Sequence, residues 1–124
     1  MNPAGFEPLI QAAREVLGHR EISEDVSCGG VAAALLTDRG SVYRGVCIDT
    51  ASSMGFCAEH AAVSAMLTAG ESRIKAIVAV GGDQKVWPPC GRCRELLWQL
   101  GALDCQVLVK EDTVVPVREL LPYR

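Results

Sequence analysis

Residues 74–80 read IKAIVAV, and every position in this stretch except Lys75 carries an apolar side chain. Such a run is typical of a strand that is covered on both faces, as in a sheet between two layers of helices. A loop over 81–89 follows, then a helix from Cys90 to about Leu100 and an apolar strand over 105–110. This strand–helix–strand order predicts parallel pairing of the two strands, with helices on the faces of the sheet.

The segments before residue 74 add a hairpin and two helices. Residues 31–37 and 41–48 are strand-like apolar runs on either side of a turn at 38–40, which predicts an antiparallel hairpin. Apolar residues recur at helical spacing over 6–18 and again from Cys57 to about Gly70. Each of these two segments is therefore predicted to be an amphipathic helix that ends at a glycine.

Together these elements predict a three-layer α/β/α sandwich around a mixed five-stranded sheet. Residues 19–30 are polar and end in a glycine pair, so they are predicted to be a loop. Residues 113–117 are predicted to be the last strand, in which Pro116 suits an edge strand or the end of a strand, and about one helical turn follows. A chain of 124 residues is typical of one domain with its own core. We therefore expect residues 1–124 to form a single domain.

The charge balance argues against a polyanionic partner. The chain has a formal net charge of −3 and a pI near 5.3, so it has no long-range attraction for nucleic acid or an anionic membrane. Arg92 and Arg94 are the only clustered basic side chains, and two arginines do not follow a phosphate backbone. A small, neutral or mildly cationic ligand fits this composition better.

The six cysteines are interpreted as reduced thiols. Residues 1–17 contain acidic side chains and a glutamine among the apolar ones, so they lack the apolar run of a signal peptide. No segment reaches the ~20 apolar residues that span a bilayer. We therefore expect a cytoplasmic protein, in a compartment that keeps thiols reduced, with no membrane partner. A core of this size does not need disulfides, which favours metal binding by some of the cysteines.

The starts of two predicted helices carry the groups of a catalytic zinc site. Cys90 and Cys93 form a Cys-X-X-Cys pair that can direct two sulfurs to one ion, and Cys57 places a third thiol at the other helix start. Three protein ligands would leave the fourth position to water, as in catalytic zinc sites. Glu59 is close enough in sequence to shuttle protons there, and His60 to donate a hydrogen bond to a thiolate.

Other interpretations of the cysteines stay open. Cys-X-X-Cys also occurs as a redox pair of the thioredoxin kind, or as half of a four-ligand structural zinc site. The chain has no second pair of this kind to complete a structural site. Cys28, Cys47 and Cys105 lie in or beside strand-like segments, where the ordinary interpretation of a cysteine is a small buried side chain. Trp87, just before two prolines, is a candidate for lining a pocket.

The motifs that contain these residues resemble the cytidine deaminase family. Cys-Ala-Glu at 57–59 is followed about thirty residues later by Pro-Cys-Gly-Arg-Cys-Arg at 89–94, a pair of motifs typical of zinc deaminases with cysteine ligands. The segments 31–46, 74–80 and 117–122 are similar to the first hairpin, the strand between the zinc-binding helices and the C-terminal end of that family. The motifs also resemble those of the blasticidin S deaminases, a sister group with the same chemistry.

The resemblance implies a cytidine deaminase-like fold and hydrolytic deamination of a cytosine ring at carbon 4. It implies a free nucleoside as the substrate, a place in pyrimidine salvage, and a homotetramer or homodimer whose active sites are completed by neighbouring chains. It also assigns a role to each motif residue: zinc ligation to Cys57, Cys90 and Cys93, proton transfer to Glu59, and orientation of the ring to the N–H of Ala58 and the carbonyl of Pro88 or Pro89.

At the sugar end of the site the chain departs from the family pattern. The family usually carries an asparagine and a glutamate that bind the ribose, and the matching residues here are Cys47 and Asp49. Cysteine is a poor hydrogen-bond partner and aspartate is one methylene shorter than glutamate. An arginine common in the family is replaced by His60, and its base-stacking aromatic residue has no counterpart in the Cys-Gly-Gly of 28–30.

These departures leave three hypotheses for the function. The first is deamination of cytidine or deoxycytidine. The second is deamination of a modified cytosine nucleoside such as blasticidin S, because a site that binds a sugar discriminates by those contacts. The third is a non-catalytic zinc-binding protein of this fold, against which the intact Glu59 argues.

Overall fold

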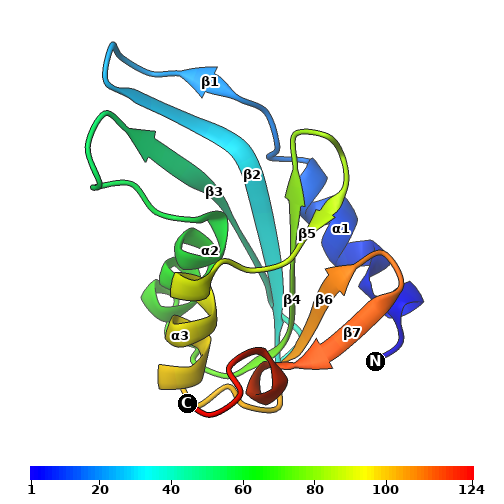
Figure 1. Cartoon of the computed structure of the whole chain (residues 1–124). Coiled ribbons are helices and arrows are strands. Elements are labelled where there is room, and N and C mark those ends of the chain that lie inside the picture. The colour runs from blue at the N-terminus through cyan, green and yellow to red at the C-terminus, as the bar shows by residue number, and fades with distance from the viewer.

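A mixed β-sheet forms the centre of the computed structural model, which describes all 124 residues. Its middle strands, β2 (Val26–Thr37) and β4 (Ile74–Gly81), run antiparallel to each other. β3 (Val42–Thr50) pairs antiparallel with β2, and β6 (Gln106–Lys110) pairs parallel with β4. β7 (Thr113–Pro116) pairs antiparallel with β6 (Figure 1). The predicted hairpin and the predicted parallel pair are both confirmed.

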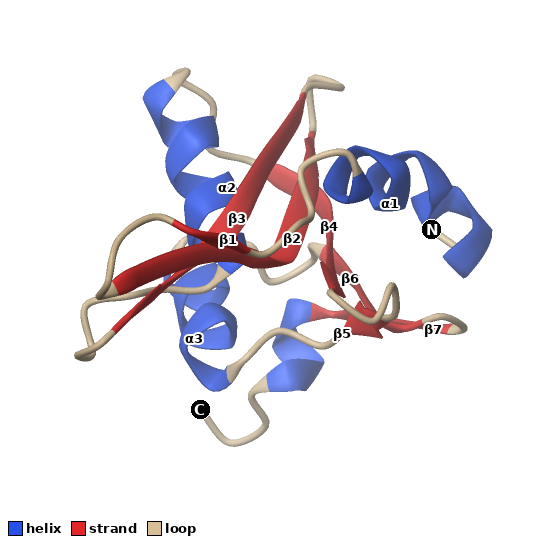
Figure 2. Ribbon diagram, turned by 90° about the horizontal axis from the view of Figure 1, so that it is seen from above, coloured by secondary structure: helices blue, strands red, loops and turns tan.

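Helices cover both faces of this sheet (Figures 1 and 2). α1 (Glu7–Arg14) packs against β2 and β4 on one face, and α2 (Ala58–Thr68) and α3 (Gly91–Gln99) lie side by side on the other. Successive residues of β2 alternate between the two layers: Ala33 belongs to the apolar cluster under α2 and α3, and Ala34 to the cluster under α1. The predicted three-layer α/β/α arrangement is confirmed.

Short elements extend beyond the predicted ones. β1 (Arg20–Glu21) pairs with the start of β2 and β5 (Val86–Trp87) pairs with β4, so the sheet has seven strands rather than five. A 3-10 turn at Pro3–Phe6 precedes α1, which ends earlier than the glycine expected to stop it. The predicted closing turn is a 3-10 helix at Val117–Leu120.

The prediction of a loop over 19–30 was wrong at two places, because residues 20–21 form β1 and residues 26–30 begin β2. The glycine pair does not end the strand there but accommodates an irregularity within it. The pairing of β2 with β3 shifts register between Cys28 and Ala32, and Gly29 has a φ of 86°. A β-bulge of this kind needs a residue that tolerates a left-handed conformation, which is why glycine suits it.

The start of α2 is fixed by a close contact with β3. A Cβ atom on Gly45 of β3 would lie 2.4 Å from the backbone nitrogen of Ala62 and 2.5 Å from Cβ of Ala61. The helix therefore packs directly on the strand backbone, with no room for a side chain between them. This contact sets the position of the helix that carries Cys57 and Glu59 at its N-terminal end.

Gly45→Ala is expected to lower the free energy of unfolding by about 1–3 kcal/mol, because the added methyl group pushes α2 away from β3. Urea denaturation followed by circular dichroism measures this change. Gly30→Ala in β2 is the matched control, since a Cβ atom there meets no heavy atom within 4 Å, and its stability should be unchanged or slightly raised. Equal losses in the two variants would contradict the close contact.

Candidate active site

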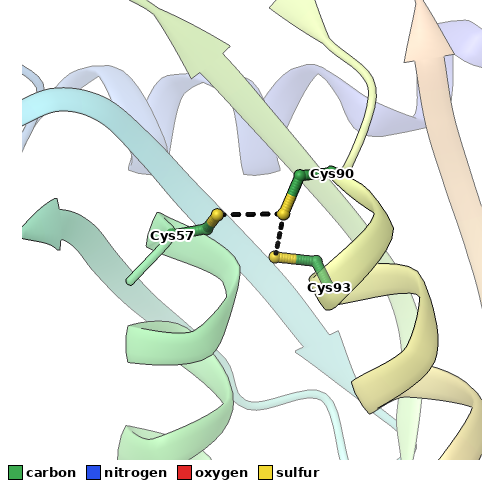
Figure 3. Close-up of side chains that lie close together, drawn as sticks. All are labelled: Cys57, Cys90 and Cys93. Carbon is green, nitrogen blue, oxygen red and sulfur yellow. Dashed lines mark hydrogen bonds between the residues drawn. The ribbon is translucent and has the colours of Figure 1, made fainter. Parts of the chain in front are cut away.

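Three thiols meet where the N-terminal ends of α2 and α3 approach each other (Figure 3). Cys57 and Cys90 immediately precede the two helices, and Cys93 lies in the first turn of α3. Sγ of Cys90 is 3.0 Å from Sγ of Cys57 and 3.4 Å from Sγ of Cys93. All three sulfurs lie within 4.8 Å of one another, and no cysteine of the chain is in a disulfide. We refer to these residues as the thiol cluster.

The pKa values of the three thiols depend on how closely the thiols are packed and how deeply they are buried. Burial, with the hydrogen bond to Cys90, raises the pKa of Cys57 to about 11. Burial raises the pKa of Cys93 far more, and the nearby Glu59 adds to the effect. Burial also opposes ionisation of Cys90, but hydrogen bonds from Cys57 and Cys93 outweigh it and lower the pKa of Cys90. Cys90 is thus the thiol of the cluster that ionises most readily, and three thiolates need a cation to offset their repulsion.

The donor set of the thiol cluster fits a zinc ion. Zinc takes thiolate ligands at ~2.3 Å, so one ion can bond to all three sulfurs at the separations found here. Cys57 and Cys90 also stand at helix N-termini, where unpaired N–H groups and the helix dipole favour negative charge. These residues are therefore able to bind such a metal.

A buried carboxyl group lies beside the thiol cluster. Glu59 is in the first turn of α2, its side chain is only 5% exposed, and it lines the same cavity as Cys57 and Cys90. Burial raises the pKa of Glu59. A raised pKa brings a carboxyl group closer to the range in which it can take up and return a proton at neutral pH. Proton transfer within the cavity is thus chemically available.

Two arginines hold the segments that carry the cysteines. Nη1 of Arg92 donates a hydrogen bond to the carbonyl of Gly55 (3.2 Å), which joins α3 to the loop before Cys57. Nε of Arg94 donates to the carbonyl of Pro89 (2.8 Å), which fixes the segment before α3. The sequence predicted these arginines only as a basic pair. In the structure Arg92 joins the two halves of the site, and Arg94 fixes the segment of Cys90 within one half.

His60 lies against the most buried thiol. Its Nδ1 atom is 3.3 Å from Sγ of Cys93, and its ring stacks with that of Phe56 at a centroid separation of 6.3 Å. Burial lowers the pKa of His60, and the charge of Arg92 lowers it further. The ring is therefore mainly neutral at pH 7, and the tautomer with a proton on Nδ1 donates to the sulfur. This is the position that the expected hydrogen bond to a thiolate requires.

The thiol cluster borders a cavity of about 620 Å³, a volume typical of sites for small molecules. Gly30 and Val31 of β2, the end of β3, the loop over 51–57 and the segment around Trp87 form its walls. Of the residues that sequence analysis did not assign to the site, Phe56, Arg92 and the serines at 52 and 53 also line it. Only Arg92 had a signal in the sequence, its place between the two cysteines of the Cys-X-X-Cys pair.

The residues expected at the substrate end lie in different settings. Cys47 is buried, and its Sγ accepts a hydrogen bond from the N–H of Val31 (3.3 Å) and lies 3.7 Å from Oδ2 of Asp49. Cys47, exposed Asp49 and Ala58 all line the cavity. Pro89 does not line it: this residue is buried and Pro88 lines the cavity instead. The remaining cysteines, at 28 and 105, are buried outside the cavity lining, as expected.

Comparisons with known proteins agree with this geometry. Residues 7–109 match the family described as "Cytidine and deoxycytidylate deaminase zinc-binding region". A cytidine deaminase from Halalkalibacterium halodurans is 37% identical over 97 residues, which cover 74% of each chain. One from Mycobacterium tuberculosis is 38% identical over 95 residues, which cover 74% of this chain and 69% of the other.

Solved structures show the same likeness over almost the whole chain. The crystal structure of cytidine deaminase from Mycobacterium leprae superposes with a TM-score of 0.80 at 28% identity, covering 94% of this chain and 97% of that one. The crystal structure of cytidine deaminase from Burkholderia pseudomallei superposes with a TM-score of 0.77 at 30% identity, covering 94% and 95%. None of the helices described above has the length and apolar character needed to cross a membrane.

Proposed function

Because the chain belongs to the cytidine and deoxycytidylate deaminase family, we propose that it catalyses the zinc-dependent hydrolysis of cytidine or deoxycytidine. The products are uridine or deoxyuridine and ammonia. The observation that carries this function is the convergence of the thiol cluster with the buried carboxyl group of Glu59 on one cavity. A modified nucleoside such as blasticidin S is not favoured, because the relatives found are cytidine deaminases.

Cys57, Cys90 and Cys93 are the proposed ligands of the zinc ion. When bound, zinc would act as a Lewis acid that lowers the pKa of a water molecule, which makes that water a nucleophile at neutral pH. The contact from Nδ1 of His60 to Sγ of Cys93 would hold that thiolate in place and withdraw part of its negative charge.

Glu59 is the proposed proton carrier. Hydrolysis at carbon 4 uses both protons of one water molecule: one leaves as the water attacks, and the other leaves the hydroxyl group that is then on carbon 4. One of them goes to the ring nitrogen and the other to the departing amino group, so one group that accepts and donates a proton in turn is sufficient. A carboxylate oxygen of Glu59 would accept each of these protons in turn and return it on the substrate side of the cavity, the first to the ring and the second to the amino group. The burial that raises the pKa of Glu59 makes its carboxylate a stronger base than an exposed one.

The start of α2 also offers a donor for orienting the base. Ala58 is the first residue of that helix and lines the cavity, and an N–H at this position has no acceptor within the helix. We propose that it donates to the cytosine ring. At the sugar end, we propose that Asp49 accepts hydrogen bonds from the sugar, whereas the thiol of Cys47 contributes little because it already accepts from Val31.

We further propose that residues 1–124 form one domain and that the enzyme acts in pyrimidine salvage in the cytoplasm as a homotetramer or homodimer. The two apolar clusters share one sheet, which supports a single folding unit. Large apolar side chains remain exposed, among them Met54 at 81% and Leu67 at 46%, and a subunit interface would cover surface of this kind. Sedimentation equilibrium tests the assembly.

The test of this function is an ammonia-release assay over a panel of amino-heterocycles: cytidine, deoxycytidine, blasticidin S, adenosine and guanosine. We expect ammonia and the matching uracil nucleoside from cytidine or deoxycytidine. Zinc content is measured on the same sample, so that loss of metal is not mistaken for lack of activity. A protein that holds zinc but releases ammonia from none of these compounds would contradict the proposal and favour a binding role.

A further inference from the structure

One wall of the cavity is an aromatic ring that the roles proposed above do not use. Trp87 is the last residue of β5, lines the cavity and is 44% exposed. The other aromatic residue of the lining, Phe56, has its ring stacked with that of His60. Trp87 is therefore the aromatic side chain with substantial surface left for a ligand to cover, and covering such a surface is favourable.

The orientation of the indole ring is fixed by its neighbours. A Cβ atom on Gly81 would lie 2.2 Å from Cε2 of Trp87, so the ring lies directly over the backbone of that glycine. Nε1 of Trp87 donates a hydrogen bond to Oδ1 of Asp83 (3.1 Å), and the same oxygen accepts from the N–H of Lys85 (3.0 Å). The pairing of β5 with β4 places Trp87 opposite Ala79. The ring thus needs little further ordering when a ligand binds.

The wall next to this ring carries no large side chain. Val31 of β2 lines the cavity and pairs with Gly81, the glycine that lies under the indole ring. A Cβ atom on Gly30 would meet no heavy atom within 4 Å, and Gly30 lines the cavity. A flat ligand that enters here finds space on the β2 side and a fixed aromatic face on the β5 side.

Trp87 and Asp49 lie on different parts of the cavity wall because of the order of the strands. β3, which carries Asp49, pairs with β2 on the side away from β4, and β5 pairs with β4. Trp87 is only three residues before Cys90, so it lies on the side of the thiol cluster that α3 contributes. The aromatic face therefore suits the part of the substrate that reacts, whereas Asp49 suits the sugar.

We propose that Trp87 stacks on the cytosine ring of the substrate and sets substrate affinity, with Gly81 and Asp83 as positioning residues. The proposal rests on the proposed function and deepens it. Stacking needs only the flat face of the base, so the contribution of Trp87 should be similar for cytidine and deoxycytidine. It should also be lost in proportion to the aromatic surface that is removed.

Trp87→Ala is expected to raise KM for both nucleosides by about 10- to 100-fold, the usual effect of removing an aromatic side chain that stacks on a base. The kcat should change little, because the ring does not touch the reacting protons. Trp87→Phe should keep most of the affinity that Trp87→Ala loses, because a ring is still present. Gly81→Ala should also raise KM, because its methyl group displaces the indole ring. Zinc content and thermal midpoint, measured in parallel, separate this effect from misfolding.

Fluorescence gives a second readout, because the chain has two tryptophans. In Trp98→Phe only Trp87 remains, and titration with the product uridine should quench its emission. In Trp87→Phe only Trp98 remains; its ring packs 5.3 Å from the guanidinium of Arg124 and is not part of the cavity lining, so uridine should leave it unchanged. An unchanged KM in Trp87→Ala, or equal quenching in the two single-tryptophan proteins, would overturn the proposal. Neither result alters ammonia release by the wild type, which tests the proposed function separately.

Discussion

Glu59→Gln is expected to lower kcat for cytidine by about 10²- to 10⁴-fold, the usual contribution of a positioned general acid–base group. The amide has nearly the shape of the carboxyl group but does not take up a proton at neutral pH. Because the side chain is only 5% exposed, bulk water is poorly placed to act as the base instead. Initial rates of ammonia release measure the loss, and zinc analysis should still find about one ion per chain, since Glu59 is not a proposed ligand.

Glu71→Gln is the matched control for this variant. Glu71 is the other buried glutamate of the chain, 9% exposed, and it accepts a hydrogen bond from the hydroxyl of Tyr43 (2.7 Å) away from the cavity lining. The same chemical change there should leave kcat at the wild-type value, even if the protein becomes less stable. Full activity in Glu59→Gln would remove this residue from the mechanism, and equal losses in the two variants would indicate a general effect of removing a buried charge.

The parts of the fold that were predicted correctly are those with a strong local pattern. The apolar run of β4 indicated a strand covered on both faces, and β4 does lie between the two apolar clusters. The same pattern implied that the helices before and after β4 could begin at one end of the sheet. That inference was needed to bring Cys57 to Cys90, because 33 residues separate them. The Cys-X-X-Cys spacing alone predicts only two of the three thiols of the cluster.

The parts that were missed depend on partners far away in the sequence. β5 has only two residues, and its pairing with β4 rather than any local pattern makes it a strand. The glycines of 28–30 favour a turn when considered alone, but pairing on both sides of β2 keeps that segment in the sheet. The hydrogen bond from Arg94 to the carbonyl of Pro89 was also not predicted, because helical periodicity does not reveal a contact between the first turn of a helix and the segment before it.

Cys93→Ala is expected to reduce zinc binding far below one ion per chain and to abolish activity. Cys93 contributes one of the three sulfurs of the cluster and is fully buried, so water or a nearby side chain does not easily take its place. Two remaining thiols form an incomplete site for a metal that usually has at least three protein ligands. Zinc stoichiometry by atomic absorption measures the change independently of turnover.

Stability offers the sharper comparison, because an ion that binds only the folded chain stabilises it by mass action. Free zinc at about 1,000 times its dissociation constant would contribute about 4 kcal/mol, so a chelator should lower the thermal midpoint of the wild type markedly. It should have no further effect on Cys93→Ala, which already lacks the ion. Cys105→Ala is the control: this thiol is 2% exposed and lies outside the cluster, so the variant loses packing energy but keeps zinc and its sensitivity to the chelator. A Cys93→Ala protein that retains one zinc and a chelator-sensitive midpoint would show that the ion is bound elsewhere.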